Sequence, residues 1–245
     1  AARYSAALDE ASVEVQSGQA DLPSLIARLV AETRALAARN ERLGRRLDDS
    51  ARQMTVLERQ LEDARREATV DGLTGLMNRR AFDQTIRTLA GTAMNSGDPL
   101  ALLVVDIDHF KAVNDTWGHA VGDAVLQLVA RRLAHRARAE DKPARFGGEE
   151  FVLLLPGTTL EEAAAIGDAL RADLESQRLV LRDTQQPIGT VTASIGVALY
   201  EPGERLADWV GRADAALYRA KAAGRNRVEV APLFGSLRET NPEAA

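Results

Sequence analysis

Acidic side chains stand at two points of the sequence where a strand is expected to end. Asp106 closes a continuous apolar run over residues 100–106, and Glu149 and Glu150 directly follow two glycines. A carboxylate at the end of a buried strand is costly to bury unless it is paired or binds a metal. Carboxylates on neighbouring strand ends form a hard-oxygen site suited to Mg²⁺ or Mn²⁺, which can hold a triphosphate and activate a hydroxyl nucleophile. The alternative is an ordinary hairpin with surface acids, in which Asp106 only caps the next turn.

The two glycines, Gly147 and Gly148, separate two strand-like segments. They suit a tight hairpin and carry no side chain that would block a phosphate. Alternation along a strand sends Glu149 and Glu150 to opposite faces of the sheet. Only one of them is therefore expected to share a site with Asp106, unless the turn bends.

Lysine is rare in this arginine-rich chain. The 31 basic residues include only Lys111, Lys142 and Lys221. A position that keeps lysine is a candidate for a compact ammonium group rather than a planar guanidinium, with chance as the alternative.

A seven-residue apolar repeat runs through residues 22–68 and indicates a coiled coil. Asn40 falls at the a position, where a buried Asn pairs with its twin and favours a parallel two-stranded register. The alternative is a single amphipathic helix that packs on its own domain. The two seam positions are filled by Leu22, Leu29, Leu36, Leu43, Ser50, Leu57 and Ala64, and by Ile26, Thr33, Asn40, Leu47, Met54, Leu61 and Ala68.

Beyond Val70 the pattern changes, and helices alternate with strands. This interleaving favours an α/β fold with a central mixed, mainly antiparallel sheet flanked by helices. Helices are predicted at 79–95, 119–138, 160–176 and 206–222, and strands at 100–106, on both sides of the glycine pair, and at 179–183, 190–199 and 226–230. Four parts follow: a linker from an upstream domain over 1–21, a coiled-coil helix over 22–70, the α/β domain over 71–230 and a flexible tail over 231–245.

Composition narrows the class of protein. A net charge of −5 argues against a general nucleic-acid binder, which needs a basic face. The absence of cysteine excludes disulfides and thiolate metal sites, and a cytoplasmic setting fits. No apolar run approaches the length that spans a bilayer. Because the chain does not begin with Met, we expect a fragment whose upstream region could carry a sensor or a membrane span.

Five stretches in order resemble the GGDEF family of diguanylate cyclases, over residues 70–230. The signature is Arg145-Phe146-Gly147-Gly148-Glu149-Glu150-Phe151, in which Glu149 stands for the family's Asp, a variant that the family accepts. The other stretches read DGLTGLMNRR at 71–80, DIDHFK at 106–111, NDTWGH at 114–119 with GD at 122–123, and ADAALY at 213–218 with AK at 220–221 and GRN at 224–226. The resemblance implies a palm-like domain that joins two GTP molecules into cyclic di-GMP, a signalling molecule, with release of two pyrophosphates.

The resemblance also implies a metal and catalytic set. Two divalent ions, Mg²⁺ or Mn²⁺, would be held by Asp106, the backbone carbonyl of Ile107 and Glu149, with Glu150 in support. Glu149 would also take the proton from the ribose 3′-hydroxyl, which requires hydrogen-bond reach. Lys111 would stabilise charge that develops on the phosphates.

Substrate contacts are implied around this set. Asn114 and Asp123 would read the guanine edge, and main-chain amides near Phe110 and Lys111 would bind phosphate. Lys221 and Arg225, expected one helical turn apart, would also contact the phosphates. His119 would lie beside the substrate, with a packed helix-start histidine as the alternative. The implied substrate-binding residues are Phe110, Asn114, His119, Asp123, Gly147, Gly148, Lys221 and Arg225.

A separate inhibitory site is implied by Arg138 and Asp141. They form an Arg-x-x-Asp that ends five residues before the glycine pair, the offset at which the family binds its product. Arg can grip guanine and phosphate in a bidentate way, and Asp can accept from guanine. Arg171 is a candidate for a second contact.

Activity would require two domains that face each other, so a homodimer through the parallel coil is expected. Three other functions remain open: a non-catalytic cyclic di-GMP receptor that uses Arg138 and Asp141, an interaction module whose working part is the coil, and another nucleotide cyclase on a similar palm.

Overall fold

The computed structural model describes residues 2–16, 21–180 and 186–234. The chain divides into two units, Ala1–Ala64 and Arg65–Ala245. Within the described ranges, no helix combines the length and the apolar character needed to cross a membrane.

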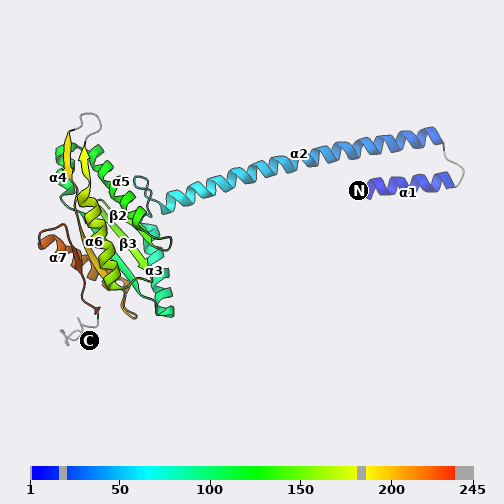
Figure 1. The fold of residues 1–245 in the computed structure, drawn as a ribbon. Helices are drawn as coiled ribbons and strands as arrows, with labels where there is room; N and C mark the ends of the chain where they lie inside the picture. Colours follow the sequence, from blue (N-terminus) through cyan, green and yellow to red (C-terminus); the bar gives the residue numbers. More distant parts are fainter. Residues whose placement is uncertain (1, 17–20, 181–185, 235–245) are drawn as a thin grey trace. The chain divides into compact units, whose positions relative to one another are not determined.

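The first unit consists of helices (Figure 1). Helix α1 spans Ala2–Gln16, and helix α2 spans Leu22–Thr69, of which the last turn belongs to the second unit. The long helix expected over residues 22–70 is therefore present, whereas the segment expected as a linker contains α1. Arg28 of α2 lies 3.7 Å from Glu10 of α1. Seam side chains of α2 are exposed in the single chain: Ile26, Leu43, Leu47, Met54, Leu57 and Leu61.

The second unit contains a five-stranded sheet in the order β2-β3-β1-β6-β7. All neighbouring strands are antiparallel except β6 and β7, which are parallel. The predicted mixed, mainly antiparallel sheet is thus confirmed. The strands are β1 Leu100–Ile107, β2 Lys142–Gly147, β3 Glu150–Pro156, β6 Ala193–Leu199 and β7 Val228–Val230, and a separate hairpin pairs β4 Arg178–Val180 with β5 Pro187–Thr190.

Helices cover both faces of this sheet (Figure 1). Strand β1 is buried along its whole length, because its alternate side chains enter two different apolar clusters. One cluster holds Leu103 with side chains of α5 and α6, and the other holds Leu102 with Trp209 of α7 and side chains of α3. The helices are α3 Arg79–Ser96, α4 Phe110–Trp117, α5 His119–Arg136, α6 Leu160–Ser176 and α7 Leu206–Ala222.

Local sequence explains where several helices begin. The Asn78 side chain accepts a hydrogen bond from the Ala81 amide and caps α3. Thr159 and Glu162 form a capping box at the start of α6. Helix α4 was not predicted, because its eight residues are too few for an apolar period to stand out. The predicted strand over 179–183 is only partly visible, since residues 181–183 lie outside the described residues.

Candidate active site

One edge of the sheet collects the chain segments that carry the predicted chemistry. Strand β1 ends there, and β3 and β6 begin there because both run antiparallel to β1. Strand β7 is parallel to β6, so the turn between α7 and β7 reaches the same edge. The sheet topology therefore brings together four loops that lie far apart in the sequence.

Asp106 is nearly buried at this edge, with 5% of its surface exposed. The Lys221 ammonium, in the last turn of α7, lies 2.8 Å from its carboxylate. Burial raises the pKa of Asp106, the hydrogen bond and charge of Lys221 oppose that rise, and the neighbouring Asp108 adds to it. Asp106 and Lys221 thus form an ion pair, although they are 115 positions apart in the sequence.

The glycine pair forms the turn between β2 and β3. Gly147 pairs with Glu150, which leaves Gly148 and Glu149 as the two residues of the turn. Gly148 has a φ of 47°, in the left-handed region that favours glycine. Glu150 is the register partner of Asp106, so the two side chains share a face of the sheet.

Glu149 lies in the turn itself, so strand alternation does not fix its direction. Burial raises the pKa of Glu149, the Asp106 carboxylate raises it further, Lys221 lowers it, and Glu150 raises it. Glu149 thus lies within electrostatic range of Asp106, Lys221 and Glu150. The condition attached to the sequence prediction, a turn that departs from strand alternation, therefore applies to Glu149.

The donor set suits a divalent cation. Two carboxylates, on Asp106 and Glu149, repel one another in a partly buried position and already attract the ammonium of Lys221. A hard cation relieves such repulsion. The Ile107 amide donates to the Glu149 carbonyl at 3.4 Å, which keeps the end of β1 against the turn. Among the described residues, no cluster of three or more acidic, His or Cys side chains forms a ready-made metal site.

Asn114 of α4 lies against Gly122 of α5. Its Oδ1 atom is buried and has no hydrogen-bond partner among the described residues. A Cβ atom added at Gly122 would lie 1.9 Å from this oxygen, so only glycine leaves room for the Asn114 side chain. An unpaired buried acceptor is costly and points to a donor that a ligand would supply. Asp123, the next residue of α5, is exposed.

The remaining predicted substrate residues lie at the start of α4, at the start of α5 and after the end of α7. Lys111 is exposed in the first turn of α4, whereas the Phe110 side chain is buried in the core, so only its main chain can face a ligand. His119 is exposed at the start of α5, so it is not a packed core histidine. Arg225 was expected to follow Lys221 by one helical turn. This spacing is wrong, because α7 ends at Ala222 and Arg225 has a φ of 64°.

Residues 68–227 match the family model described as "Diguanylate cyclase, GGDEF domain". The chain belongs to the GGDEF family. The relative "Diguanylate cyclase VdcA" of Vibrio cholerae is 36% identical over 208 residues, which are 85% of this chain and 60% of that protein. The chain therefore spans less than two thirds of that relative's length.

Two solved GGDEF structures show the same fold. The coiled coil and GGDEF domain of DgcB from Caulobacter crescentus, in complex with c-di-GMP, is 41% identical with a TM-score of 0.75, over 77% of this chain and 99% of that one. Diguanylate cyclase SiaD from Pseudomonas aeruginosa, in complex with its activator SiaC, is 33% identical with a TM-score of 0.64, over 94% and 89% of the two chains. The long helix before a GGDEF domain thus has a structural precedent.

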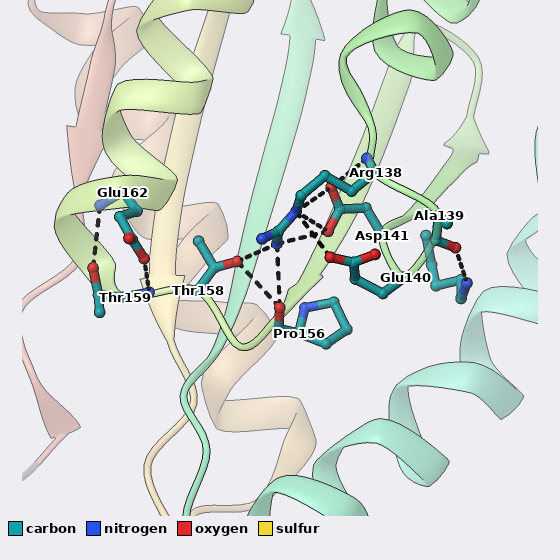
Figure 2. A network of polar contacts seen from close by, with 9 residues as sticks. Arg138, Ala139, Glu140, Asp141, Pro156, Thr158, Thr159 and Glu162 are labelled. Carbon is teal, nitrogen blue, oxygen red and sulfur yellow. Dashed lines mark hydrogen bonds and ion pairs between the residues drawn. The ribbon is translucent and has the colours of Figure 1, made fainter.

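Arg138 and Asp141 form a compact cluster in the GGDEF domain (Figure 2). Arg138 Nε donates to both carboxylate oxygens of Asp141, at 3.2 and 3.3 Å, and the Arg138 amide donates to Oδ2 at 2.7 Å. Arg138 Nη2 also donates to Thr158 Oγ1 at 2.6 Å and to the Pro156 carbonyl at 3.2 Å. The Asp141 side chain is buried while that of Arg138 remains 46% exposed, so part of the guanidinium stays open to a ligand.

Arg171 belongs to a different cluster of the GGDEF domain. Its guanidinium donates to Asp168 at 2.7 Å, to Glu175 at 2.8 Å and to Asn226 at 3.2 Å. The structure does not join it to Arg138 or Asp141 by any described contact. Arg171 was a candidate for the inhibitory site from the resemblance to the family, and the helix α6 that carries it directs it to the turn before β7.

Two residues for which the sequence predicted no role form hydrogen bonds next to the candidate site of the GGDEF domain. Asp108 is buried and accepts three hydrogen bonds at the end of β1. Arg145 donates to the Gly148 carbonyl at 2.8 and 3.0 Å and lies 3.3 Å from Asp71. The position of Asp108, just after a buried strand and two residues from Asp106, was a usable signal, because a carboxylate there needs partners.

Proposed function

We propose that this protein is a diguanylate cyclase that condenses two GTP molecules into cyclic di-GMP and two pyrophosphates. Membership of the GGDEF family supports the reaction. The observation that carries the proposal is the convergence of Asp106, Glu149 and Lys221 on one sheet edge beside the glycine turn. A partly buried acidic pair with an adjacent cation suits phosphoryl transfer, which depends on positioning and charge stabilisation.

Each domain would bind one GTP, and two domains would face each other. The 3′-oxygen of each GTP attacks the α-phosphate of the other GTP, and the bond to the β-phosphate breaks to release pyrophosphate. Two such steps close the ring. Each domain is therefore half of an active site.

Different side chains would accept the proton and bind the phosphates. Glu149 would accept the proton of the 3′-hydroxyl, a role that its raised pKa supports. Lys111, Lys221 and Arg225 would bind phosphate oxygens and balance the charge that develops on them. Gly147 and Gly148, which carry no side chain, would let phosphate approach the turn.

Asp106, Glu149 and the Ile107 carbonyl would hold two divalent ions, Mg²⁺ or Mn²⁺, with Glu150 beside them. Bound there, the ions would neutralise the triphosphate and acidify the attacking hydroxyl.

Guanine would be read by Asn114 and Asp123. The unpaired Oδ1 atom of Asn114 supports this role, because guanine presents N–H donors where adenine does not. His119 would lie beside the base.

Arg138 and Asp141 would form a product-binding inhibitory site. The half-exposed guanidinium of Arg138 supports this assignment, since an anionic dinucleotide can contact its open edge. Arg171 is left out of this site because its side chain is engaged elsewhere.

A homodimer through a parallel coil of α2 would supply the second half-site, and the exposed seam of α2 supports it. GTP and cyclic di-GMP would be its small-molecule partners, with no nucleic acid. The compartment would be the cytoplasm, where GTP is available.

The test is product formation from GTP with Mg²⁺, followed by chromatography, with ATP in a parallel reaction. Glu149→Gln should lower the rate by at least about 100-fold, the usual contribution of a general base. Glu161→Gln, an exposed glutamate in the first turn of α6, is the matched control and should retain full activity.

Each other outcome identifies a different function. Cyclic di-GMP that binds through Arg138 without any turnover would indicate a receptor. Turnover of ATP in preference to GTP would indicate another nucleotide cyclase. If the protein neither binds cyclic di-GMP nor turns over a nucleotide, its function would be that of an interaction module that acts through the coil.

A further inference from the structure

Asp108 forms a buried hydrogen-bonded centre that the proposed mechanism does not use. Its carboxylate accepts from Ser194 Oγ at 2.6 Å, from Thr192 Oγ1 at 2.8 Å and from the Asn226 amide at 3.0 Å. Its own amide donates to the Thr192 carbonyl at 2.9 Å. One carboxylate thus joins the end of β1, the start of β6 and the turn between α7 and β7.

The backbone of that turn adopts an unfavourable conformation. Arg225 and Asn226 have φ angles of 64° and 47°, in the left-handed region that residues with a Cβ rarely adopt. Such conformations persist only where the surroundings fix them. The Arg225 amide donates to the Ala220 carbonyl at 3.0 Å and the Asn226 amide to Asp108, so α7 and β1 hold the turn from two sides.

Arg171 of α6 holds the same turn from a third side. Its Nη1 donates to Asn226 Oδ1 at 3.2 Å and to Glu175 Oε2 at 2.8 Å. Asn226 Nδ2 in turn donates to Glu175 Oε1 at 2.9 Å, which closes a ring of three side chains. Only 17% of the Arg171 side chain is exposed, whereas that of Glu175 is 50% exposed, so the guanidinium is the covered part of the ring.

The turn matters because of the cations at its two ends. Lys221 precedes it and contacts Asp106 at 2.8 Å. Arg225 lies within it, directly before Asn226, whose amide donates to Asp108 two residues after Asp106. The position of the turn therefore sets where the side chains of Lys221 and Arg225 lie relative to Asp106.

We propose that Asp108, Arg171 and Asn226 form a brace that positions Arg225 for the triphosphate of GTP, and that Arg171 is a positioning residue of the active site. This inference rests on the proposed cyclase function, because it assigns Arg225 to the substrate. It gives Arg171 a role in substrate binding instead of the role in product inhibition that the resemblance to the family suggested.

The two roles predict opposite results for Arg171→Gln. With the brace weakened, KM for GTP rises by about five- to tenfold while kcat changes less than about twofold, the pattern of lost binding. The affinity for cyclic di-GMP, measured by calorimetry without GTP, stays unchanged. A residue of the inhibitory site would do the reverse, with weaker cyclic di-GMP binding and an unchanged KM, and that result would overturn the proposal.

Two further variants separate positioning from general damage. Asn226→Gly removes the ring contacts but suits a positive φ, so the turn can form, and KM should again rise. Arg205→Gln is the matched control, because Arg205 also pairs with an acid three residues away, Asp208, in an exposed position. It should change neither KM nor product affinity. Thermal unfolding of each variant checks that the fold is retained.

A double-mutant cycle with Arg225→Gln gives the sharpest readout. If Arg171 acts through Arg225, Arg171→Gln adds no further rise in KM once Arg225 is replaced. An equal rise in both backgrounds contradicts the brace. If the unaltered protein makes no cyclic di-GMP, the proposed function fails by itself, and the same cycle is then measured on the dissociation constant for GTP with Mg²⁺.

Discussion

At the scale of single residues, Gly122 shows that one position beside Asn114 accepts only glycine. Gly122 is buried in α5, and a Cβ there would meet both Asn114 Oδ1 and, at 3.2 Å, the Phe110 ring. Glycine normally weakens a helix by about 1 kcal/mol relative to alanine. Its presence in α5 is therefore explained by the Asn114 side chain that lies against it.

Gly122→Ala tests this arrangement. The added Cβ must displace the Asn114 side chain, so we expect KM for GTP to rise about tenfold, the loss of one hydrogen bond to a buried acceptor. The preference for GTP over inosine triphosphate, which lacks the 2-amino group, should fall as well. Steady-state kinetics with both nucleotides measure this.

The control is Gly211→Ala in α7, where nothing lies within 4 Å of the new Cβ. That variant should keep wild-type kinetics and gain stability. An unchanged KM in Gly122→Ala would show that Asn114 does not contact the base.

At the scale of elements, the segment after α2 is tied to the glycine turn. Asp71 accepts from the Thr74 amide at 2.9 Å and from its hydroxyl at 2.7 Å, and Arg145 Nη1 lies 3.3 Å from the same carboxylate. The other nitrogens of Arg145 bind the Gly148 carbonyl. Arg145 of β2 thus connects the segment after α2, which contains Asp71, to the turn that carries Glu149.

The Asp71 contacts should make stability depend on pH. Burial raises the pKa of Asp71, but the Thr74 hydrogen bonds and Arg145 outweigh it, so the pKa lies below its ordinary value of 3.8. A carboxyl with a lowered pKa stabilises the fold above its unfolded pKa and loses this effect as pH falls through its folded pKa. Asp71→Asn should therefore cost about 1 kcal/mol at pH 7 and much less near pH 3.

Urea unfolding at the two pH values measures this difference. Asp98→Asn, in the exposed loop between α3 and β1, is the control and should leave stability unchanged at both. A cost in Asp71→Asn that is equal at pH 3 and pH 7 would mean that packing, and not the charge, matters.

At the scale of the whole molecule, much of the apolar seam of α2 is exposed in the part of the chain that the structure describes. Leu47 and Leu57 are 70% and 63% exposed. Each leucine buried in a dimer contributes about 2 kcal/mol, so a coil of this length has ample apolar surface for association.

Replacing both residues, Leu47→Glu with Leu57→Glu, should convert a dimer to a monomer in sedimentation experiments. Cyclic di-GMP synthesis at micromolar protein should then fall sharply, because two half-sites meet only by chance, while the affinity for GTP is retained. Arg52→Glu with Arg59→Glu adds the same number of acids on the opposite face of the helix and should keep the dimer. Full activity in the monomer would contradict the half-site mechanism.

The sequence alone determined much of the fold. The apolar run before Asp106 predicted a buried strand, and the seven-residue repeat predicted the long helix, because periodicity follows directly from side-chain order. The ordered motifs also predicted the family, which the match over residues 68–227 confirms. Short elements such as α4 escaped, since one or two turns show no period.

Only the tertiary structure decided which side chains meet. Strand alternation predicted that only one of the two glutamates would share a site with Asp106, but Glu149 lies in the turn, where alternation does not apply, and Glu150 is the register partner of Asp106. The resemblance to the family made Arg171 a candidate for the inhibitory site, and α6 directs it to Asn226. Spacing along the chain fixes local direction, but long-range contacts such as that of Lys221 with Asp106 depend on how the strands are ordered in the sheet.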